Sequence, residues 1–391
     1  MLLLKNGFVR PMDREAFAGD VLIENGKIRA LGKDLSSGGA DVIDASGLFV
    51  FPGFIDAHCH IGMWEDGMGA EGADGNEATD PVTPQLCAID GLNPFDPCFR
   101  EAREAGVTTV ITGPGSANVI GGQFAALKTS GRSVEDMLLR NPVAMKAATG
   151  ENPKGVYAER KVTPTTRMAI ASLFRSTLTK AQEYKRGRET LSGDKKPDRD
   201  IAMEALIPVL ERKLTMKIHA HRADDILTAL RLAKEFNIRV TIDHCTEGYL
   251  ITDILKDRLA EQGAGVILGP LLSERSKIEL KNLTFKAPRV LEEAGIPFAM
   301  MTDHPVIPIQ FLPVQAGIAV REGLSEETAL RSITRTAAEI VGVSDRVGTL
   351  APGMDADVAV FDAHPFDYRA HCVLTLINGK IVHDRRSAEV R

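Results

Sequence analysis

The middle of the chain, residues 51–345, alternates short apolar segments with longer amphipathic ones. The short segments are rich in apolar and β-branched residues, as buried parallel strands are. They lie at about residues 51–60, 107–112, 118–127, 143–147, 215–220, 238–243, 264–268 and 296–303. Helical periods fill most of the gaps, for example over 224–236 and 325–341. This alternation predicts an α/β fold with parallel strands, and eight strands over this length predict a TIM-like (β/α)8 barrel.

The two ends of the chain show a different pattern, in which short apolar runs are separated by turn residues. Asn25-Gly26 and Asn378-Gly379 each stand between two such runs, and Asn-Gly is a strong signal for a two-residue hairpin turn. The same four letters, Asn-Gly-Lys-Ile, occur at both places. We therefore expect residues 1–50 and 346–391 to form one small β-sandwich domain, and residues 51–345 to form the barrel.

Polar residues gather where the predicted strands end. Six of the nine histidines lie at such ends. They are His58 and His60 after the first strand, His219 and His221 after the fifth, His244 after the sixth and His304 after the eighth, and Asp243 and Asp303 directly precede the last two. Residues two apart on a strand share a face, and a barrel brings the C-terminal ends of its strands together. Imidazole and carboxylate groups are zinc ligands, so the pattern predicts a metal centre.

Composition narrows the possible partners. The 391 residues are 44% hydrophobic and 26% charged, as in an ordinary globular protein, and the net charge of -6 offers no basic field for nucleic acid. No apolar run approaches the roughly 20 residues of a membrane helix. Five cysteines without paired spacing predict free thiols in a reducing compartment. We therefore expect a cytoplasmic protein that acts on a small molecule and binds neither nucleic acid nor membrane.

Taken together, the motifs resemble the amidohydrolase superfamily, whose members are metal-dependent hydrolases with a barrel and a terminal β-sandwich. The resemblance covers almost the whole chain. It is carried by Pro52-Gly-Phe-Ile-Asp-Ala-His-Cys-His60, the later histidines, Thr302-Asp303 and Gly348-Thr-Leu-Ala-Pro-Gly-Met-Asp-Ala-Asp-Val-Ala-Val360. Within the superfamily the chain is most similar to imidazolonepropionases and related amidohydrolases. Met145-Lys-Ala-Ala-Thr-Gly-Glu-Asn-Pro-Lys154 resembles an uncharacterised group of that branch.

The resemblance implies a role for each strand-end residue. His58 and His60 would bind a buried metal ion, and Asp303 would bind a metal and act as the general base towards water. His219 and His244 would bind a second metal, or would serve one metal and the substrate, which places His244 among the catalytic residues as well. Further groups are expected to contact the substrate or to support the ligands, namely His221, Gln123 and His304.

The ligand between two metal ions has two candidates. Binuclear members of the family use a carboxylated lysine on the fourth strand, others use a glutamate, and some bind one metal. Lys146 lies at the lysine position and is the favoured ligand, because a lysine among metal ligands can have a lowered pKa. Glu151, five residues later, is the alternative. Zinc suits these ligands best, and manganese, iron and nickel also fit them.

The activity that the resemblance implies is hydrolysis of a C–N bond, in an amide, a peptide-like compound or a cyclic amide, by a metal-activated water. Deamination of an aminated heterocycle uses the same water and is the alternative. A third reading, a non-catalytic scaffold, would predict lost ligands, whereas all of them are present.

Segments outside the strands are expected to build the substrate pocket. Residues 61–96 are rich in Gly, Pro and acidic residues and follow the first histidine pair, so we expect them to overhang the site. Loops near Gly121-Gly-Gln123, Glu151-Asn-Pro153 and residues 273–281 would form the rest. In relatives, the terminal β-region often supports contacts between copies, so a homo-oligomer is compatible with the resemblance.

Overall fold

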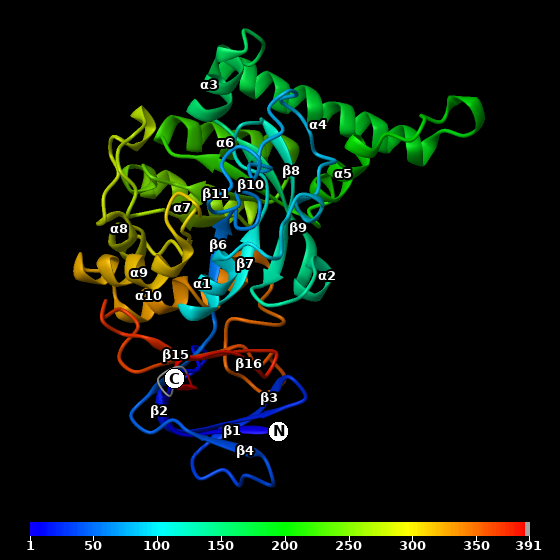
Figure 1. Ribbon diagram of the computed structural model, residues 1–391. Coiled ribbons are helices and arrows are strands. Elements are labelled where there is room, and N and C mark those ends of the chain that lie inside the picture. The colour runs from blue at the N-terminus through cyan, green and yellow to red at the C-terminus, as the bar shows by residue number, and fades with distance from the viewer. Residues whose placement is uncertain (388–391) are drawn as a thin grey trace.

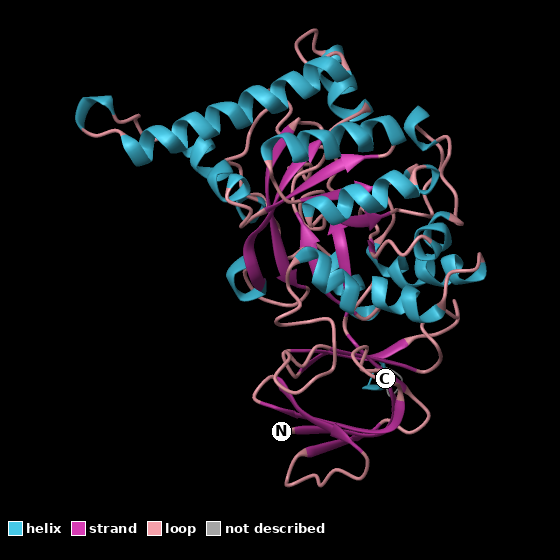
Figure 2. Cartoon of the chain, turned by 180° about the vertical axis from the view of Figure 1, so that it is seen from behind, coloured by secondary structure: helices cyan, strands magenta, loops and turns pink. Residues whose placement is uncertain are grey.

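The computed structural model describes residues 1–387 as a barrel with helices around it and a separate sheet built from residues 2–52 and 358–384 (Figure 1). Each of the two sheets has eight strands. Seen from behind, the helices lie around the strands of the barrel, and the terminal sheet lies below them (Figure 2). The predicted fold class, a TIM-like barrel with a small β-structure built from both chain ends, is confirmed.

The terminal sheet joins strands from the first 52 residues to strands after residue 357. Its members are β1 (Leu2–Val9), β2 (Phe17–Glu24), β3 (Lys27–Gly32), β4 (Asp41–Asp44), β5 (Phe49–Pro52), β14 (Val358–Phe361), β15 (Cys372–Ile377) and β16 (Lys380–Asp384). Strand β5 pairs with β1 in parallel and with β14 in antiparallel orientation, and so links the two ends of the chain. Alternating residues of these strands bury their own apolar core, which includes Val21, Val50 and Val358.

Both Asn-Gly pairs form the predicted hairpin turns, one between β2 and β3 and the other between β15 and β16. Asn25 and Gly26 have φ of 51° and 77°, and Asn378 and Gly379 have φ of 49° and 72°. These left-handed values match a turn of the I′ kind, which Asn and Gly tolerate. The two turns also pack together, because a Cβ on Gly379 would lie 3.2 Å from Gly26 Cα.

The barrel strands supply the framework of the site. They are β6 (Phe54–Cys59), β7 (Val107–Thr112), β8 (Ile120–Lys128), β9 (Leu138–Ala148), β10 (Thr215–Ala220), β11 (Val240–His244), β12 (Gly265–Leu268) and β13 (Phe298–Met300). Their hydrogen-bonded order follows the chain from β6 to β13. The first and last strands meet through backbone bonds at the site itself, where Asp303 N donates to His58 O at 3.1 Å and His60 N donates to His304 O at 2.8 Å.

One strand departs from the prediction of eight parallel strands. β8 runs antiparallel to both of its neighbours, β7 and β9, while the other pairs in the barrel are parallel. The connection from β7 to β8, residues 113–119, contains no helix. A parallel crossover needs a dozen or more residues, so a connection this short can only reverse the chain.

The helices that surround the barrel are α1 (Cys98–Glu104), α2 (Val134–Met137), α3 (Glu151–Glu159), α4 (Arg167–Thr190), α5 (Ile201–Leu210), α6 (Ala223–Phe236), α7 (Thr252–Gln262), α8 (Ala287–Glu293), α9 (Leu312–Arg321), α10 (Glu326–Ser332) and α11 (Arg335–Val341). Short 3-10 turns are η1 (Ala88–Asp90), η2 (Gly193–Lys195), η3 (Gly248–Leu250), η4 (Ile278–Leu280), η5 (Ile309–Phe311) and η6 (Arg385–Ser387). In Figure 1 the far end of α4, with α5 beside it, extends beyond the barrel. Among residues 1–387, the structure contains no helix with the length and apolar character that crossing a membrane requires.

The helical pattern at 325–341 forms two helices where the sequence predicted one. Ser325 caps α10 as expected, because its Oγ accepts from Thr328 N. The break comes at Ile333 and Thr334. The Ile333 carbonyl accepts from Ile55 N of β6 at 2.8 Å, and the Thr334 hydroxyl donates to Leu330 O. These competing bonds interrupt the helical ladder and attach the break to the barrel.

Lys128, at the end of β8, connects the barrel to the terminal sheet. It is 3% exposed and forms ion pairs with Asp355 and Asp357 just before β14. We expect Lys128→Met to lower the free energy of unfolding by about 3–5 kcal/mol, because it leaves a buried carboxylate without its partner. Urea denaturation measures the effect, and Lys213→Met, at a 74% exposed side chain, is the matched control with an expected loss of about 0–1 kcal/mol.

The same variant has an expected pH dependence. Burial raises the pKa of Asp357 even with Lys128 beside it. A carboxyl with a raised folded-state pKa favours folding most at low pH, and that contribution is lost as pH rises. Because the charge of Lys128 lowers the pKa of Asp357, removing Lys128 raises this pKa further and makes the ionised carboxylate more costly to bury. The deficit of Lys128→Met is therefore smallest below about pH 3.9, the pKa of an unfolded-state aspartate, and grows as pH rises. A deficit independent of pH would contradict this assignment.

Gly53 lies at the crossing from β5 to β6, where the chain leaves the terminal sheet for the barrel. A Cβ there would lie 2.0 Å from Thr108 Oγ1. We expect Gly53→Ala to lower the free energy of unfolding by about 1–3 kcal/mol through overpacking. Gly155→Ala in α3 is the control, since a Cβ at that position has no neighbour within 4 Å in the described part of the chain. Thermal melts of both variants would test the difference, and equal midpoints would contradict it.

Candidate metal centre

A cavity of about 330 Å³ opens at the C-terminal ends of the barrel strands. Its lining includes His60, His219, His221, His244 and Asp303 from strand ends, and Trp64, Asn76, Asn152 and Lys277 from loops. Trp64 and Asn76 belong to the segment 61–96, which was expected to overhang the site. Four of the six histidines predicted at strand ends therefore share one cavity with loop residues, while His58 and His304 are not among the described residues that line it.

The first cluster consists of His58, His60, His244 and Asp303, and it forms where the first barrel strand, β6, meets the residues after the last one, β13. His60 Nε2 lies 3.2 Å from Asp303 Oδ1, and His58 Nε2 lies 3.5 Å from the same oxygen. One potential ligand atom each from His58, His244 and Asp303 lies within 4.8 Å of the others. His58 is fully buried, while the side chain of Asp303 is 14% exposed and lines the cavity. The pairing of β6 with the residues after β13 is what brings these groups together.

In His58, His60 and His244 the other ring nitrogen, Nδ1, has a partner within the protein. Nδ1 of His58 lies 2.6 Å from Asp243 Oδ2, Nδ1 of His60 lies 2.7 Å from Gly113 O, and Nδ1 of His244 lies 2.9 Å from Gly269 O. A carbonyl oxygen can only accept, so Nδ1 carries the hydrogen in His60 and His244 and Nε2 keeps its lone pair. Outer partners of this kind orient the imidazole of a metal ligand.

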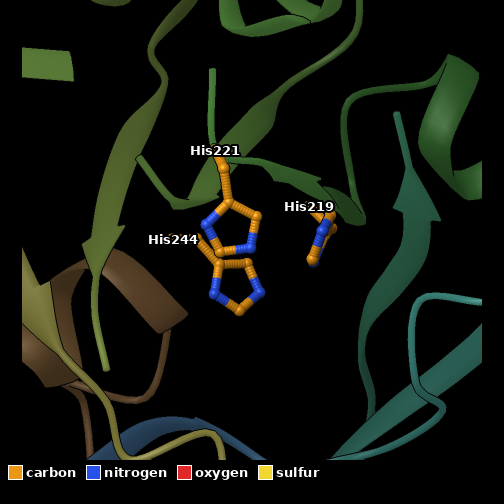
Figure 3. A group of neighbouring side chains, drawn as sticks. All are labelled: His219, His221 and His244. Atoms are coloured by element: carbon orange, nitrogen blue, oxygen red, sulfur yellow. The ribbon is translucent and has the colours of Figure 1, made fainter. Parts of the chain in front are cut away.

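The second cluster consists of His219, His221 and His244, at the ends of β10 and β11 (Figure 3). One ring nitrogen of each lies within 4.8 Å of those of the others. The rings of His221 and His244 stack with centroids 4.3 Å apart, and the His219 centroid is 4.3 Å from that of His244. Nδ1 of His221 lies 2.7 Å from Thr246 Oγ1. Nδ1 of His219 is buried and has no hydrogen-bond partner within residues 1–387.

Lys146 lies on β9 beside the first cluster. It is fully buried, and its Nζ is 3.2 Å from His58 Nε2. Burial is the main cause of the lowered pKa of His58, His219 and His244, and the positive charge of Lys146 lowers the pKa of each further. Burial lowers the pKa of Lys146 to about 8. A buried lysine with this pKa has a substantial neutral fraction near pH 7.5.

Glu151, the alternative to Lys146, begins α3 and is bound elsewhere. Its Oε2 accepts from the backbone N–H of Glu279 at 3.2 Å, and its own N–H donates to Glu279 Oε2 at 3.1 Å. Lys146 therefore lies beside His58, whereas the Glu151 carboxylate is bound to the backbone of Glu279.

The two remaining residues of the predicted site lie at its edge. Gln123 on β8 donates from Nε2 to Pro84 O at 3.3 Å, so its side chain holds the segment 61–96 against the barrel. His304 is 4% exposed, and neither ring nitrogen has a hydrogen-bond partner in the described part of the chain. Neither residue lines the cavity as the described residues outline it.

The electrostatics of the site suit cation binding. Burial lowers the pKa of His58, His219 and His244 well below the usual value, and lowers that of His221 to about 3. Neutral imidazoles keep the lone pair that a metal requires. Burial acts to raise the pKa of Asp303, but its contact with His60 and the positive charge of nearby Lys146 outweigh burial and hold this pKa below its usual range. The donor set therefore fits a divalent cation, with neutral nitrogens and an ionised carboxylate facing one cavity.

Sequence reasoning missed several residues that support the site. Lys217 and Asp243 lie inside the barrel, with Lys217 Nζ 3.0 Å from Asp243 Oδ2 and 3.1 Å from Ala57 O. Lys217 holds the carboxylate of Asp243, and this carboxylate in turn orients His58. Asp243 was noticed only as a neighbour of His244, although a carboxylate directly before a ligand histidine was an available signal. Glu279, which is 1% exposed and lies beside His219 and His221, is a further missed residue.

Comparison with known proteins shows which family the sequence resembles. A model of the amidohydrolase family matches residues 173–383. Amidohydrolase tasK of Hapsidospora irregularis is 29% identical over 395 residues, covering 94% of this chain and 40% of that protein, so the chain spans less than half of this relative. A dihydroorotase of Elusimicrobium minutum is 24% identical over 396 residues, covering 92% of this chain and 88% of that protein.

A solved structure, that of an amidohydrolase from Thermotoga maritima MSB8, is also similar over almost the whole chain. It has 45% sequence identity and a TM-score of 0.95, and the match covers 98% of this chain and 100% of that one. The barrel, the terminal sheet and their connections are therefore shared between the two proteins.

Proposed function

The chain belongs to the amidohydrolase family, and from this we propose that it hydrolyses a C–N bond of a small molecule with a metal-activated water. The bond belongs to an amide, a peptide-like compound or a cyclic amide. Relatives named amidohydrolase, dihydroorotase and allantoinase support hydrolysis at C–N bonds in general.

The observation that carries the proposal is the convergence of ligand groups from distant parts of the chain on one cavity. His58, His60 and Asp303 meet across the seam between β6 and the residues after β13, and His219 and His244 face the same space from β10 and β11. Buried imidazoles and carboxylates are unfavourable unless a partner satisfies them, and a divalent cation does so.

These residues would hold two divalent cations, with zinc as the ion that best suits the ligands. His58, His60 and Asp303 would hold the first, and His219 and His244 would contribute to the second. When bound, the cations lower the pKa of a water molecule towards neutrality and polarise a carbonyl oxygen.

Lys146 is proposed as the shared ligand after its amine has reacted with carbon dioxide. The neutral amine attacks the carbon of carbon dioxide, a C–N bond forms, and the amine loses one proton to give a carbamate. Support comes from the complete burial of Lys146, its contact with His58 and its lowered pKa. The product carries a negative charge where the amine carried none or a positive one, and so balances the charge of the cations.

Asp303 is proposed as the proton carrier. Its carboxylate lines the cavity, and its surroundings hold its pKa below the usual range, so it is ionised near neutral pH. It accepts a proton from the attacking water as the oxygen bonds to the carbonyl carbon, and delivers that proton to the leaving nitrogen as the C–N bond breaks. The products are a carboxylate and an amine.

A screen of small amides tests the proposal. The zinc-reconstituted protein would be incubated with N-acyl amino acids, dipeptides, cyclic amides and aminated heterocycles in oxygen-18-labelled water. We expect a new carboxylate that carries the label, formed together with a new amine. After the metal has been removed by a chelator, neither product should form. Release of ammonia from an aminated heterocycle, with label at the former amine carbon and no amide cleaved, would instead identify a deaminase.

A further inference from the structure

Glu279 is a buried carboxylate that the proposed mechanism leaves unused. It lies in η4, between β12 and α8, and is 1% exposed. Its Oε2 is held by the N–H of Glu151. Its Oε1 has no hydrogen-bond partner in residues 1–387. A buried carboxylate oxygen without a partner is rare in folded proteins, and a bound ion is one of the features that explain it.

The unpartnered oxygen faces the histidine pair at the end of β10. Oε1 lies 3.5 Å from His219 Nε2 and 3.6 Å from His221 Nε2. These separations are too long for good hydrogen bonds. They are close to the separation of two ligand atoms on one tetrahedral cation, which is about 3.4 Å when each bond is about 2.1 Å long.

The first cluster shows the same spacing. Asp303 Oδ1 lies 3.2 and 3.5 Å from Nε2 of His60 and His58, so each histidine pair of the barrel faces one carboxylate oxygen in a similar way. The first arrangement joins β6 to the residues after β13, and the second joins the end of β10 to η4. His244 has a potential ligand atom close to those of both clusters.

We propose that Glu279 and His221, together with His219 and His244, are ligands of the second divalent cation. This inference rests on the proposed metal-dependent function and specifies which residues hold the second ion. His221 then belongs to the metal centre instead of the substrate pocket. Glu279 adds a second negative charge to a ligand set that otherwise contributes neutral imidazoles and the shared carbamate of Lys146. The reciprocal hydrogen bonds between Glu151 and Glu279 fix that carboxylate, which gives Glu151 a role in support of the ion.

The test is a zinc titration of the metal-free full-length protein in a competing chelator buffer, combined with elemental analysis and with absorption spectra of the cobalt-substituted protein. Glu279→Gln keeps the shape of the side chain and removes its charge. Glu274→Gln, at an exposed position of the same loop, is the matched control. We expect two ions in the wild type and in Glu274→Gln. In Glu279→Gln, the first ion should stay and the second should bind more than 100-fold more weakly, beyond the roughly 10–100-fold effect of losing an outer partner.

His221→Asn tests whether His221 is itself a ligand of the second ion or only orients His219. If Glu279 and His221 are both ligands, each variant loses the second ion and changes the cobalt spectrum. An unchanged affinity for the second zinc ion in either variant would overturn the inference but not the proposed metal-dependent hydrolase. The same holds if the wild type binds one ion and both variants retain it. A wild type that binds no ion would instead overturn the proposed function. Thermal melts of the metal-free proteins check that each variant is folded.

Discussion

Replacing Asp303 with asparagine is expected to lower kcat by about 10²–10⁴-fold, the range that general acid–base catalysis contributes. Asparagine keeps the size of the side chain, but it accepts no proton from the attacking water. It also removes the oxygen charge that faces Nε2 of His58 and His60. The effect should therefore appear in kcat and in the affinity of the first cation, as measured by steady-state kinetics and metal titration.

The control for Asp303→Asn is Asp90→Asn, at an exposed position of the segment 61–96. It should leave both kcat and metal affinity within a factor of about two, since exposed substitutions away from special sites have small effects. Full activity of Asp303→Asn with both cations bound would show that another group carries the proton.

Replacing Lys146 with alanine is expected to abolish the binding of at least one of the two cations and to lower kcat by about 100-fold or more, because the shared ligand is lost. Glu151→Ala is the comparison variant. Its carboxylate accepts from the backbone of Glu279, so its loss should weaken the second ion only modestly. Elemental analysis of both variants, purified without chelator, measures the difference.

Reconstitution provides a second test of the lysine. If its carbamate is needed, the metal-free wild type should recover activity with zinc and bicarbonate and recover little with zinc in a solution depleted of carbon dioxide. Two ions retained in Lys146→Ala but lost in Glu151→Ala would reverse the assignment and make the glutamate the shared ligand.

The parts of the site that the sequence predicted depend on local geometry. His58-Cys-His60 and His219-Ala-His221 each predict two imidazoles on the same face of a strand, because side chains alternate along a strand. A barrel then gathers the strand ends, so the convergence of these residues follows from the fold class. The hairpin turns at Asn25 and Asn378 are equally local, and both were predicted correctly.

Strand ends that leave regular geometry were harder to predict. Alternation places Asp243 and His244 on opposite faces, yet the site uses both. His244 has a φ of 72°, and Asp303 has a φ of 54°, values that are uncommon for residues other than glycine. Such conformations depend on tertiary contacts, for example the bond between His244 Nδ1 and Gly269 O, and the local sequence does not reveal them.

Glu279 shows the limit of reasoning from single segments. It lies in a loop that was expected to form part of the pocket, but no motif distinguishes it from the neighbouring Glu274. Its position depends on Glu151, 128 residues earlier in the chain, and on the two histidines of β10. The orientation of β8 is a different kind of miss. The short connection after β7 was visible in the sequence and would have predicted an antiparallel strand.

The most direct measurement is the metal content per chain of wild-type protein purified without chelator, followed by chelation, reconstitution and an amide-hydrolysis assay at each stage. The proposed function predicts two divalent ions per chain, loss of activity when they are removed, and recovery of activity as they are restored. Amide hydrolysis that continues in protein free of metal, or a chain that binds no divalent ion even after reconstitution, would contradict a metal-dependent hydrolase.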